Sequence, residues 1–173
     1  MTTLYLIRHP KVAVAPGVCY GRSDVSLAEP VDTLAAQLRT QLPEHFTLLS
    51  SPATRCLTLA HALGNPLIDP RLQEIDFGAW EMRPYDAIER GLIDTWASDP
   101  LHFRAHGGES VAQMQARCIL ALETALQGAP THLVIVSHAG PLRALAGHLR
   151  GLTEDAWMQL NFGYGSLTRI SVG

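Results

Sequence analysis

Three short runs of apolar residues, at positions 4–7, 46–49 and 133–136, each stop abruptly at polar residues. A continuous apolar run of this length, without polar alternation, is typical of a strand that is buried on both faces of a parallel sheet. We therefore expect three core strands, each of which delivers polar side chains at its carboxyl end. A further strand is expected at 166–172.

Helical patterns lie between these strands. Apolar residues spaced three and four apart predict helices at 31–42, 52–63, 110–127 and 141–149, and glycine or proline follows each of them closely. Ser110 and Gln113 have the spacing of a capping box at the start of the third helix. Strands that alternate with helices predict an α/β fold, a three-layer α/β/α sandwich with a mostly parallel sheet.

The stretch 76–108 departs from this alternation. It is rich in Asp, Pro, Gly and aromatic residues, and we expect only short helical pieces, near 84–90 and 92–98. Because 173 residues are close to the usual size of one domain, we interpret the chain as a single domain, residues 1–173, in which 76–108 covers the site.

Composition narrows the function classes. Hydrophobic residues make up 47% of the chain and charged residues 17%, which excludes disorder as the main state. The net charge of −3 leaves no basic surplus for nucleic acid or an anionic membrane. Three scattered cysteines predict neither a disulfide framework nor a cysteine zinc site. We expect a cytoplasmic protein that binds neither nucleic acid nor membrane, and a homodimer is left open.

Four residues form the candidate site: Arg8, His9, Arg55 and His138. The carboxyl ends of parallel strands meet at one edge of a sheet, so we expect these side chains to face a common pocket. Guanidinium forks match phosphate oxygens, and the helix start near Pro52 adds backbone N–H groups. A neutral imidazole can attack phosphorus and become phosphohistidine, while a protonated second imidazole stabilises the transferring group.

Phosphoryl transfer to a histidine also needs a carboxyl group that protonates the leaving oxygen. Glu74 and Glu81 are both candidates for this proton donor. Two histidines with a carboxylate also suit zinc, but the sequence has no H-x-x-x-H pair, and two arginines would repel a cation. We therefore expect no metal and no organic cofactor.

Five stretches then carry a resemblance that covers nearly the whole chain. They are 6–9 (Leu-Ile-Arg-His), 50–56 (Ser-Ser-Pro-Ala-Thr-Arg-Cys), 72–81 (Leu-Gln-Glu-Ile-Asp-Phe-Gly-Ala-Trp-Glu), 107–110 (Gly-Gly-Glu-Ser) and 136–140 (Val-Ser-His-Ala-Gly). In these motifs the sequence resembles the histidine phosphatase superfamily, also called the phosphoglycerate mutase-like family. The resemblance implies a phosphorylated nucleophile at His9, a proton donor at Glu74 in preference to Glu81, and a phosphate pocket of Arg8, Arg55 and His138.

Two details refine this resemblance. Ala139 follows His138 where the acid phosphatase and phytase branch has an acidic residue, so the chain resembles the branch with a separate glutamate. At 8–12 the usual Arg-His-Gly-Glu-Thr of the resembled family is replaced by Arg-His-Pro-Lys-Val, which loses a hydroxyl and an acidic residue near the pocket. The candidate substrate-binding residues added to the two arginines are Tyr20, Arg22, Ser23 and Ala139.

The short chain favours hydrolysis of a small phosphomonoester, because the family's mutases must exclude water and generally have longer covers. The loop at 19–25 resembles that of alpha-ribazole phosphatases, which implies alpha-ribazole 5'-phosphate as a candidate substrate. A phosphoglycerate mutase-type phosphotransferase stays an alternative, because Arg83, Arg90 and Arg104 could hold a second anion. A phosphoprotein (phosphohistidine) phosphatase, or a module that only binds such groups, is the third hypothesis.

Overall fold

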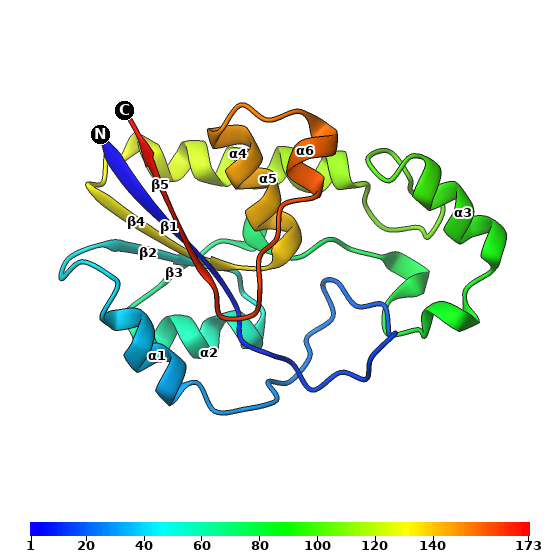
Figure 1. The fold of residues 1–173 in the computed structure, drawn as a ribbon, viewed down its shortest axis with the longest axis horizontal. Helices are drawn as coiled ribbons and strands as arrows, with labels where there is room; N and C mark the ends of the chain where they lie inside the picture. Colours follow the sequence, from blue (N-terminus) through cyan, green and yellow to red (C-terminus); the bar gives the residue numbers. More distant parts are fainter.

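A five-stranded sheet runs through the computed structural model, which describes all 173 residues (Figure 1). The strands are β1 (Thr2–Arg8), β2 (Thr47–Ser50), β3 (Leu67–Ile68), β4 (His132–Ser137) and β5 (Leu167–Val172). Their order is β3-β2-β4-β1-β5, and only β5 runs antiparallel to its neighbour. The predicted α/β fold with a mostly parallel sheet is confirmed.

The two central strands set the position of the site. The apolar residues of β1 and β4 are almost completely buried, as expected for strands covered on both faces. Their parallel register pairs Leu6 with Ile135 and Arg8 with Ser137. The next residues, His9 and His138, therefore leave the sheet side by side.

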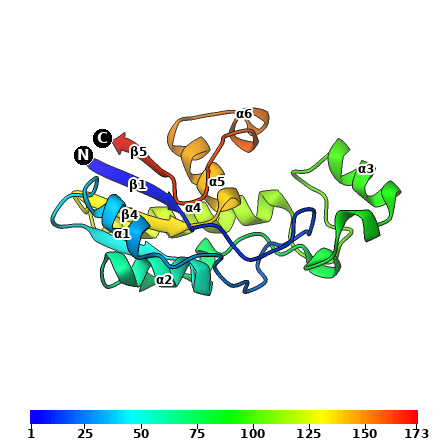
Figure 2. The same cartoon turned by 60° about the horizontal axis from the view of Figure 1, so that its bottom comes forward.

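Helices cover both faces of the sheet (Figures 1 and 2). One layer contains α1 (Asp32–Arg39) and α2 (Thr54–Leu63), and the other contains α4 (Val111–Gln127), α5 (Ala139–Leu149) and α6 (Glu154–Met158). Alternate residues of β1 point to opposite layers, with Leu6 in the cluster under α4 and α5, and Ile7 in the cluster under α1 and α2. None of the six helices is long and apolar enough to cross a membrane.

The predicted capping box is present at the start of α4. The Ser110 hydroxyl accepts from the Gln113 backbone N–H at 3.1 Å, and the Gln113 side chain accepts from the Ser110 N–H at 2.9 Å. The sequence did not predict the short edge strand β3 or the helix α6. The α6 helix packs closely on α5 because Gly147 leaves room for Trp157, where an added Cβ would lie 2.2 Å from the Trp157 Cβ.

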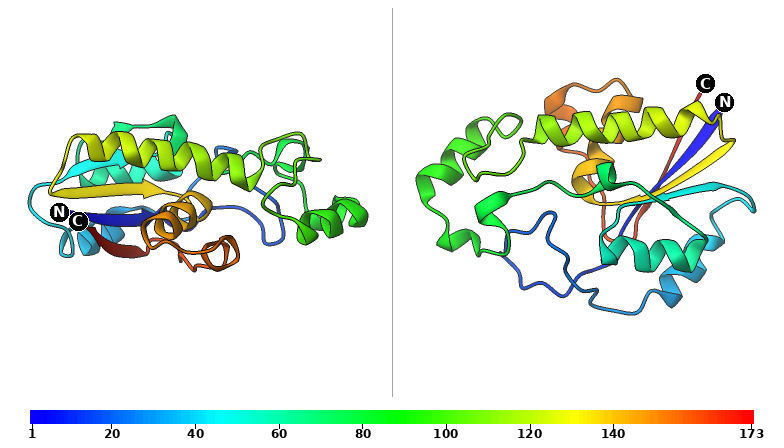
Figure 3. Two further views of the ribbon diagram at one scale, coloured as in Figure 1. Left: turned by 90° about the horizontal axis from the view of Figure 1, so that it is seen from above. Right: turned by 180° about the vertical axis from the view of Figure 1, so that it is seen from behind.

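The segment 76–108 lies beyond the carboxyl ends of the strands (Figure 3). It contains only short helical pieces. Two of them lie near the expected positions, η3 (Tyr85–Ala87) and α3 (Arg90–Ser98), whereas η2 (Gly78–Trp80), and η1 (Pro70–Leu72) before the segment, were not predicted. Trp80, Ile88 and Phe103 form a small apolar cluster with Cys19, apart from the two clusters of the sheet. The contact with Cys19 joins this segment to the loop after β1.

Candidate active site

His9 and His138 meet at the carboxyl edge of the sheet. Their ring centroids are 5.2 Å apart, in an edge-on arrangement, and the two residues are 2% and 1% exposed. Arg55, in the first turn of α2, is close enough to both imidazoles for its charge to lower their pKa values. The structure thus brings together the four residues that the sequence placed in one pocket.

The His9 ring is held with one nitrogen free. Its Nδ1 lies 2.8 Å from the carbonyl oxygen of Pro10, so Nδ1–H donates there and the lone pair is on Nε2. Burial, assisted by the charges of Arg55 and Arg8, lowers the pKa of His9 to about 3. The imidazole is therefore neutral at neutral pH. Proline at position 10 still supplies the backbone carbonyl that fixes this tautomer.

His138 occupies a more enclosed position. Its Nε2 lies 2.8 Å from the Ser51 hydroxyl and 3.5 Å from the Cys56 sulfur. Burial, with Arg55 beside it, lowers the pKa of His138 well below the ordinary value. Burial also raises the pKa of the Cys56 thiol to about 12, so this sulfur is present as the thiol. Both imidazoles are therefore neutral at neutral pH.

Neither pocket arginine is paired with a carboxylate. Arg55 is fully buried and donates to the carbonyls of Gly21 and Ser23, both at 2.7 Å. Arg8 donates to the carbonyl of Phe162 at 2.7 Å, and the Nε atoms of both arginines lack a partner. A buried charge without a counter-charge is strongly unfavourable. Arg55 is such a charge, and the half-buried Arg8 adds a second cation without a carboxylate partner, so this edge of the sheet indicates a site for a doubly charged anion.

Two tyrosines lie over the two arginines. The Tyr164 ring is 4.0 Å from the Arg8 guanidinium carbon, and the Tyr20 ring is 5.5 Å from that of Arg55. The two hydroxyl groups are 3.1 Å apart. Tyr20 was a candidate from the sequence, whereas Tyr164 was missed. The only signal for Tyr164 is an aromatic residue between two glycines just before the last strand.

The two candidate carboxylates have different surroundings. Glu74 faces the cavity, where its carboxylate accepts from the N–H groups of Ile75 at 2.9 Å and Gly140 at 3.2 Å. An added Cβ at Gly140 would lie 2.4 Å from Oε1 of Glu74, so a larger residue there would displace the carboxylate. Glu81 instead accepts from the N–H groups of Gly21 and Arg22, both at 2.8 Å. The structure therefore places Glu74, and not Glu81, at the cavity.

A cavity of about 610 Å³ extends from His9 and Arg8 toward 76–108 and α6. Its apolar wall consists of Ile75, Phe77, Tyr85, Trp96, Pro100, Val111, Met114, Trp157 and Met158. Tyr20 and Ala139 also line it, as the sequence indicated. Arg22 lies in a neighbouring cavity and pairs with Asp76 at 3.4 Å, and the Ser23 hydroxyl donates to Glu81 at 3.1 Å.

At the carboxyl edge of a mostly parallel sheet, two arginines without carboxylate partners and two neutral histidines line one site. This arrangement is typical of an enzyme that acts on phosphoryl groups. The described chain contains no group of three His, Cys, Asp or Glu residues arranged to hold a metal ion.

Comparisons with known proteins agree with this class. The profile of the histidine phosphatase superfamily (branch 1) matches residues 4–173. The chain is 31% identical to the glucosyl-3-phosphoglycerate phosphatase of Mycolicibacterium vanbaalenii, over 89% of this chain and 76% of that protein. It is 29% identical to the "Probable phosphoglycerate mutase GpmB" of Yersinia pestis, over 98% of this chain and 85% of the relative. The crystal structure of the alpha-ribazole phosphatase from Shigella flexneri superposes with a TM-score of 0.88 at 25% identity, over 99% of this chain and 91% of that one.

The chain therefore belongs to the histidine phosphatase superfamily, branch 1. It is a phosphatase of that family.

The lowered pKa values of the two buried histidines predict a dependence of stability on pH. Each imidazole is neutral when folded and gains a proton on unfolding below the ordinary pKa of 6.5. Stability is therefore complete above pH 6.5 and is lost as the pH falls toward the folded-state pKa, which is about 3 for His9. From about pH 7 to about pH 5 we expect a loss of about 2 kcal/mol per histidine.

Urea unfolding in phosphate-free buffer measures this loss. The double variant His9→Gln/His138→Gln should lose much less stability over that interval than the wild type, and the exposed His61→Gln control should behave like the wild type. An equal loss in the double variant would show that other groups cause the pH dependence.

Proposed function

We propose that this protein hydrolyses a small phosphomonoester without a metal ion, through a phosphohistidine intermediate on His9. One observation carries the proposal: the free Nε2 of a neutral imidazole stands beside Arg8 and Arg55, two cations with no carboxylate partner. A phosphoryl dianion supplies the missing counter-charge, and guanidinium groups match its oxygens.

The proposed reaction has two steps. Nε2 of His9 attacks phosphorus in line with the leaving oxygen, the P–O bond breaks, and Glu74 gives its proton to the departing alkoxide. Water then attacks the phosphorus of the phosphohistidine, Glu74 takes one proton from that water, the P–N bond breaks to restore neutral His9, and inorganic phosphate leaves. Arg8 and Arg55 hold the equatorial oxygens throughout. The bound dianion favours protonation of His138, which then donates to a phosphoryl oxygen.

The lining of the cavity favours a phosphate ester whose alcohol group is flat and apolar. Phe77, Tyr85 and Trp96 present aromatic surface, and Asp155 adds a negative charge that would repel a second anionic group. The similarity to the alpha-ribazole phosphatase from Shigella flexneri also supports a substrate of this kind. We therefore propose alpha-ribazole 5'-phosphate as the candidate substrate.

A mutase-type transfer of phosphate is the second candidate, and Arg143 favours it. This arginine lines the same cavity and could hold a second anionic group. The three arginines considered from the sequence are placed elsewhere: Arg83 donates to the carbonyl of Ala87, Arg90 pairs with Asp94, and Arg104 lines the neighbouring polar cavity. A phosphoprotein is disfavoured as substrate because the site lies inside a cavity beneath 76–108.

Phosphate release from a panel of esters in the presence of EDTA tests the function. The panel contains alpha-ribazole 5'-phosphate, 3-phosphoglycerate, phosphoserine, a sugar phosphate, a nucleotide and a phosphohistidine protein. We expect turnover in EDTA with a preference for the ester with a flat apolar alcohol. Conversion of 3-phosphoglycerate to its isomer without net phosphate release would support the mutase instead, and loss of all activity in EDTA would contradict the metal-free mechanism.

The role of Glu74 predicts a loss that depends on the leaving group. In Glu74→Gln we expect hydrolysis of alkyl phosphates to fall by about 10²- to 10⁴-fold, because a poor leaving group needs the proton. Hydrolysis of nitrophenyl phosphate should fall much less. Steady-state kinetics on both esters measures the difference, with Glu81→Gln as the matched control. Equal losses on both esters in Glu74→Gln would show that Glu74 is not the proton donor.

A further inference from the structure

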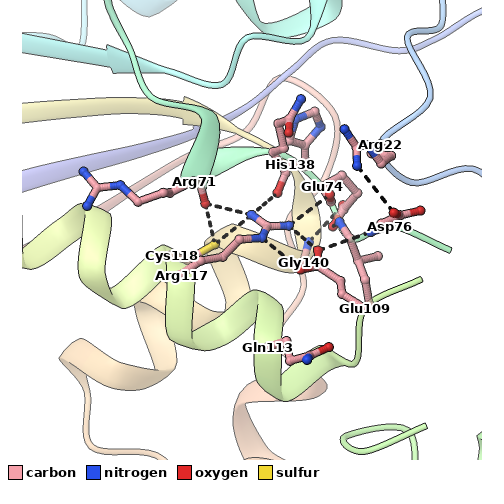
Figure 4. A network of polar contacts seen from close by, with 12 residues as sticks. Arg22, Arg71, Glu74, Asp76, Glu109, Gln113, Arg117, Cys118, His138 and Gly140 are labelled. Carbon is pink, nitrogen blue, oxygen red and sulfur yellow. Dashed lines mark hydrogen bonds and ion pairs between the residues drawn. The ribbon is translucent and has the colours of Figure 1, made fainter. Parts of the chain in front are cut away.

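The backbone that carries Glu74 is held by side chains and not by a neighbouring strand. The segment 71–74 begins within the short η1 turn, and the carbonyl of Leu72 accepts from the Ser137 hydroxyl at the end of β4 at 2.7 Å. NH1 of Arg117 donates to the carbonyls of Arg71 and Gln73, both at 2.7 Å, and NH2 donates to the carbonyl of Glu74 at 3.1 Å (Figure 4). One guanidinium group therefore fixes three carbonyls in four residues.

Glu109 holds the backbone on the other side of Glu74. Its carboxylate accepts from Nε of Arg117 at 3.1 Å and also from NH2. The same carboxylate accepts from the backbone N–H of Asp76 at 3.2 Å. The ion pair is mostly buried, with side chains 23% and 21% exposed. Arg117 and Glu109 thus bind the chain both before and after the proton donor.

Glu74 lies between two cavities. Its side chain lines the catalytic cavity and also a separate polar cavity of about 480 Å³, whose lining includes Arg117 and Glu109. The ion pair therefore supports Glu74 from the side away from His9. The carboxylate itself is held by the backbone N–H groups of Ile75 and Gly140.

We propose that Arg117, oriented by Glu109, is a positioning residue that sets the location of the Glu74 carboxyl group for proton transfer. This inference rests on the proposed function of Glu74 as proton donor. The physical reason is geometric, because a catalytic group displaced by about 1 Å can lose about 10²-fold in rate. Without the guanidinium, the carbonyls of Gln73 and Glu74 lose their donor, the carbonyl of Arg71 keeps only the Cys118 thiol, and the segment is free to shift away from the leaving oxygen.

The test separates positioning from a general structural role. Arg117→Met should slow hydrolysis of an alkyl phosphate by about 10- to 100-fold, with a change of less than about 3-fold on nitrophenyl phosphate. Arg117→Lys keeps the charge, but one ammonium group cannot reach all three carbonyls, so we expect an intermediate loss with the same selectivity.

A double-variant comparison gives a second readout. When Glu74→Gln has already removed the proton, Arg117→Met should add almost no further loss on the alkyl phosphate, because no acid remains to be positioned. Arg71→Met is the matched control, since it breaks the Arg71–Asp69 ion pair of the same segment without touching Glu74. The control should keep the wild-type ratio of the two rates.

Folding of the variants is checked by thermal unfolding. If Arg117→Met leaves Glu109 unpaired and does not fold, the variant Arg117→Met/Glu109→Gln removes that charge and undergoes the same comparison. Equal losses on both esters, or full additivity with Glu74→Gln, would overturn the positioning role even if Glu74→Gln is itself selective. If Glu74→Gln shows no selectivity, the acid role of Glu74 fails and this inference fails with it.

Discussion

The register between β1 and β4 is the constraint on which the site depends. Arg8 is paired with Ser137, so the next residue of each strand is a histidine and the two rings meet. A slip of one residue would send alternate side chains to the opposite face and would move both the apolar core and the pocket. The buried apolar residues of both strands prevent such a slip. The packing of the core therefore also sets the geometry of the chemistry.

Burial affects the histidines and the arginines of this pocket differently. The imidazoles lose their charge on burial, and their pKa values fall below the ordinary range. The guanidinium groups of Arg8 and Arg55 stay charged, and backbone carbonyls solvate them in place of carboxylates. The site thus keeps a neutral nucleophile next to an uncompensated positive field. This combination favours a dianionic phosphoryl group over a cation.

Much of the fold could be predicted because its signals are local. Short stretches of sequence are enough to recognise the apolar strands, their alternation with helices and the Ser110 cap. The β3 strand has only two residues, both exposed, and α6 has only five, so neither leaves a clear periodic pattern. The convergence of Arg8, His9, Arg55 and His138 followed from the ends of parallel strands.

Other parts of the site depend on contacts between distant residues and were not visible in the sequence. In the loop after β1, Glu81 accepts from the backbone N–H of Arg22 and from the Ser23 hydroxyl, while the Arg22 side chain pairs with Asp76, and neither residue lines the catalytic cavity. Tyr164 reaches Arg8 only because β5 returns beside β1. Arg117 acts on backbone carbonyls, which no residue pattern encodes.

Trapping of the phosphorylated enzyme tests the central claim most directly. The protein is mixed with substrate, quenched in alkali within one turnover, digested and analysed by mass spectrometry. The account predicts a phosphoryl group on His9 that is stable in alkali and labile in acid. The His9→Asn variant should carry no such group. A phosphoryl group on another residue, or turnover that persists in His9→Asn, would contradict the account.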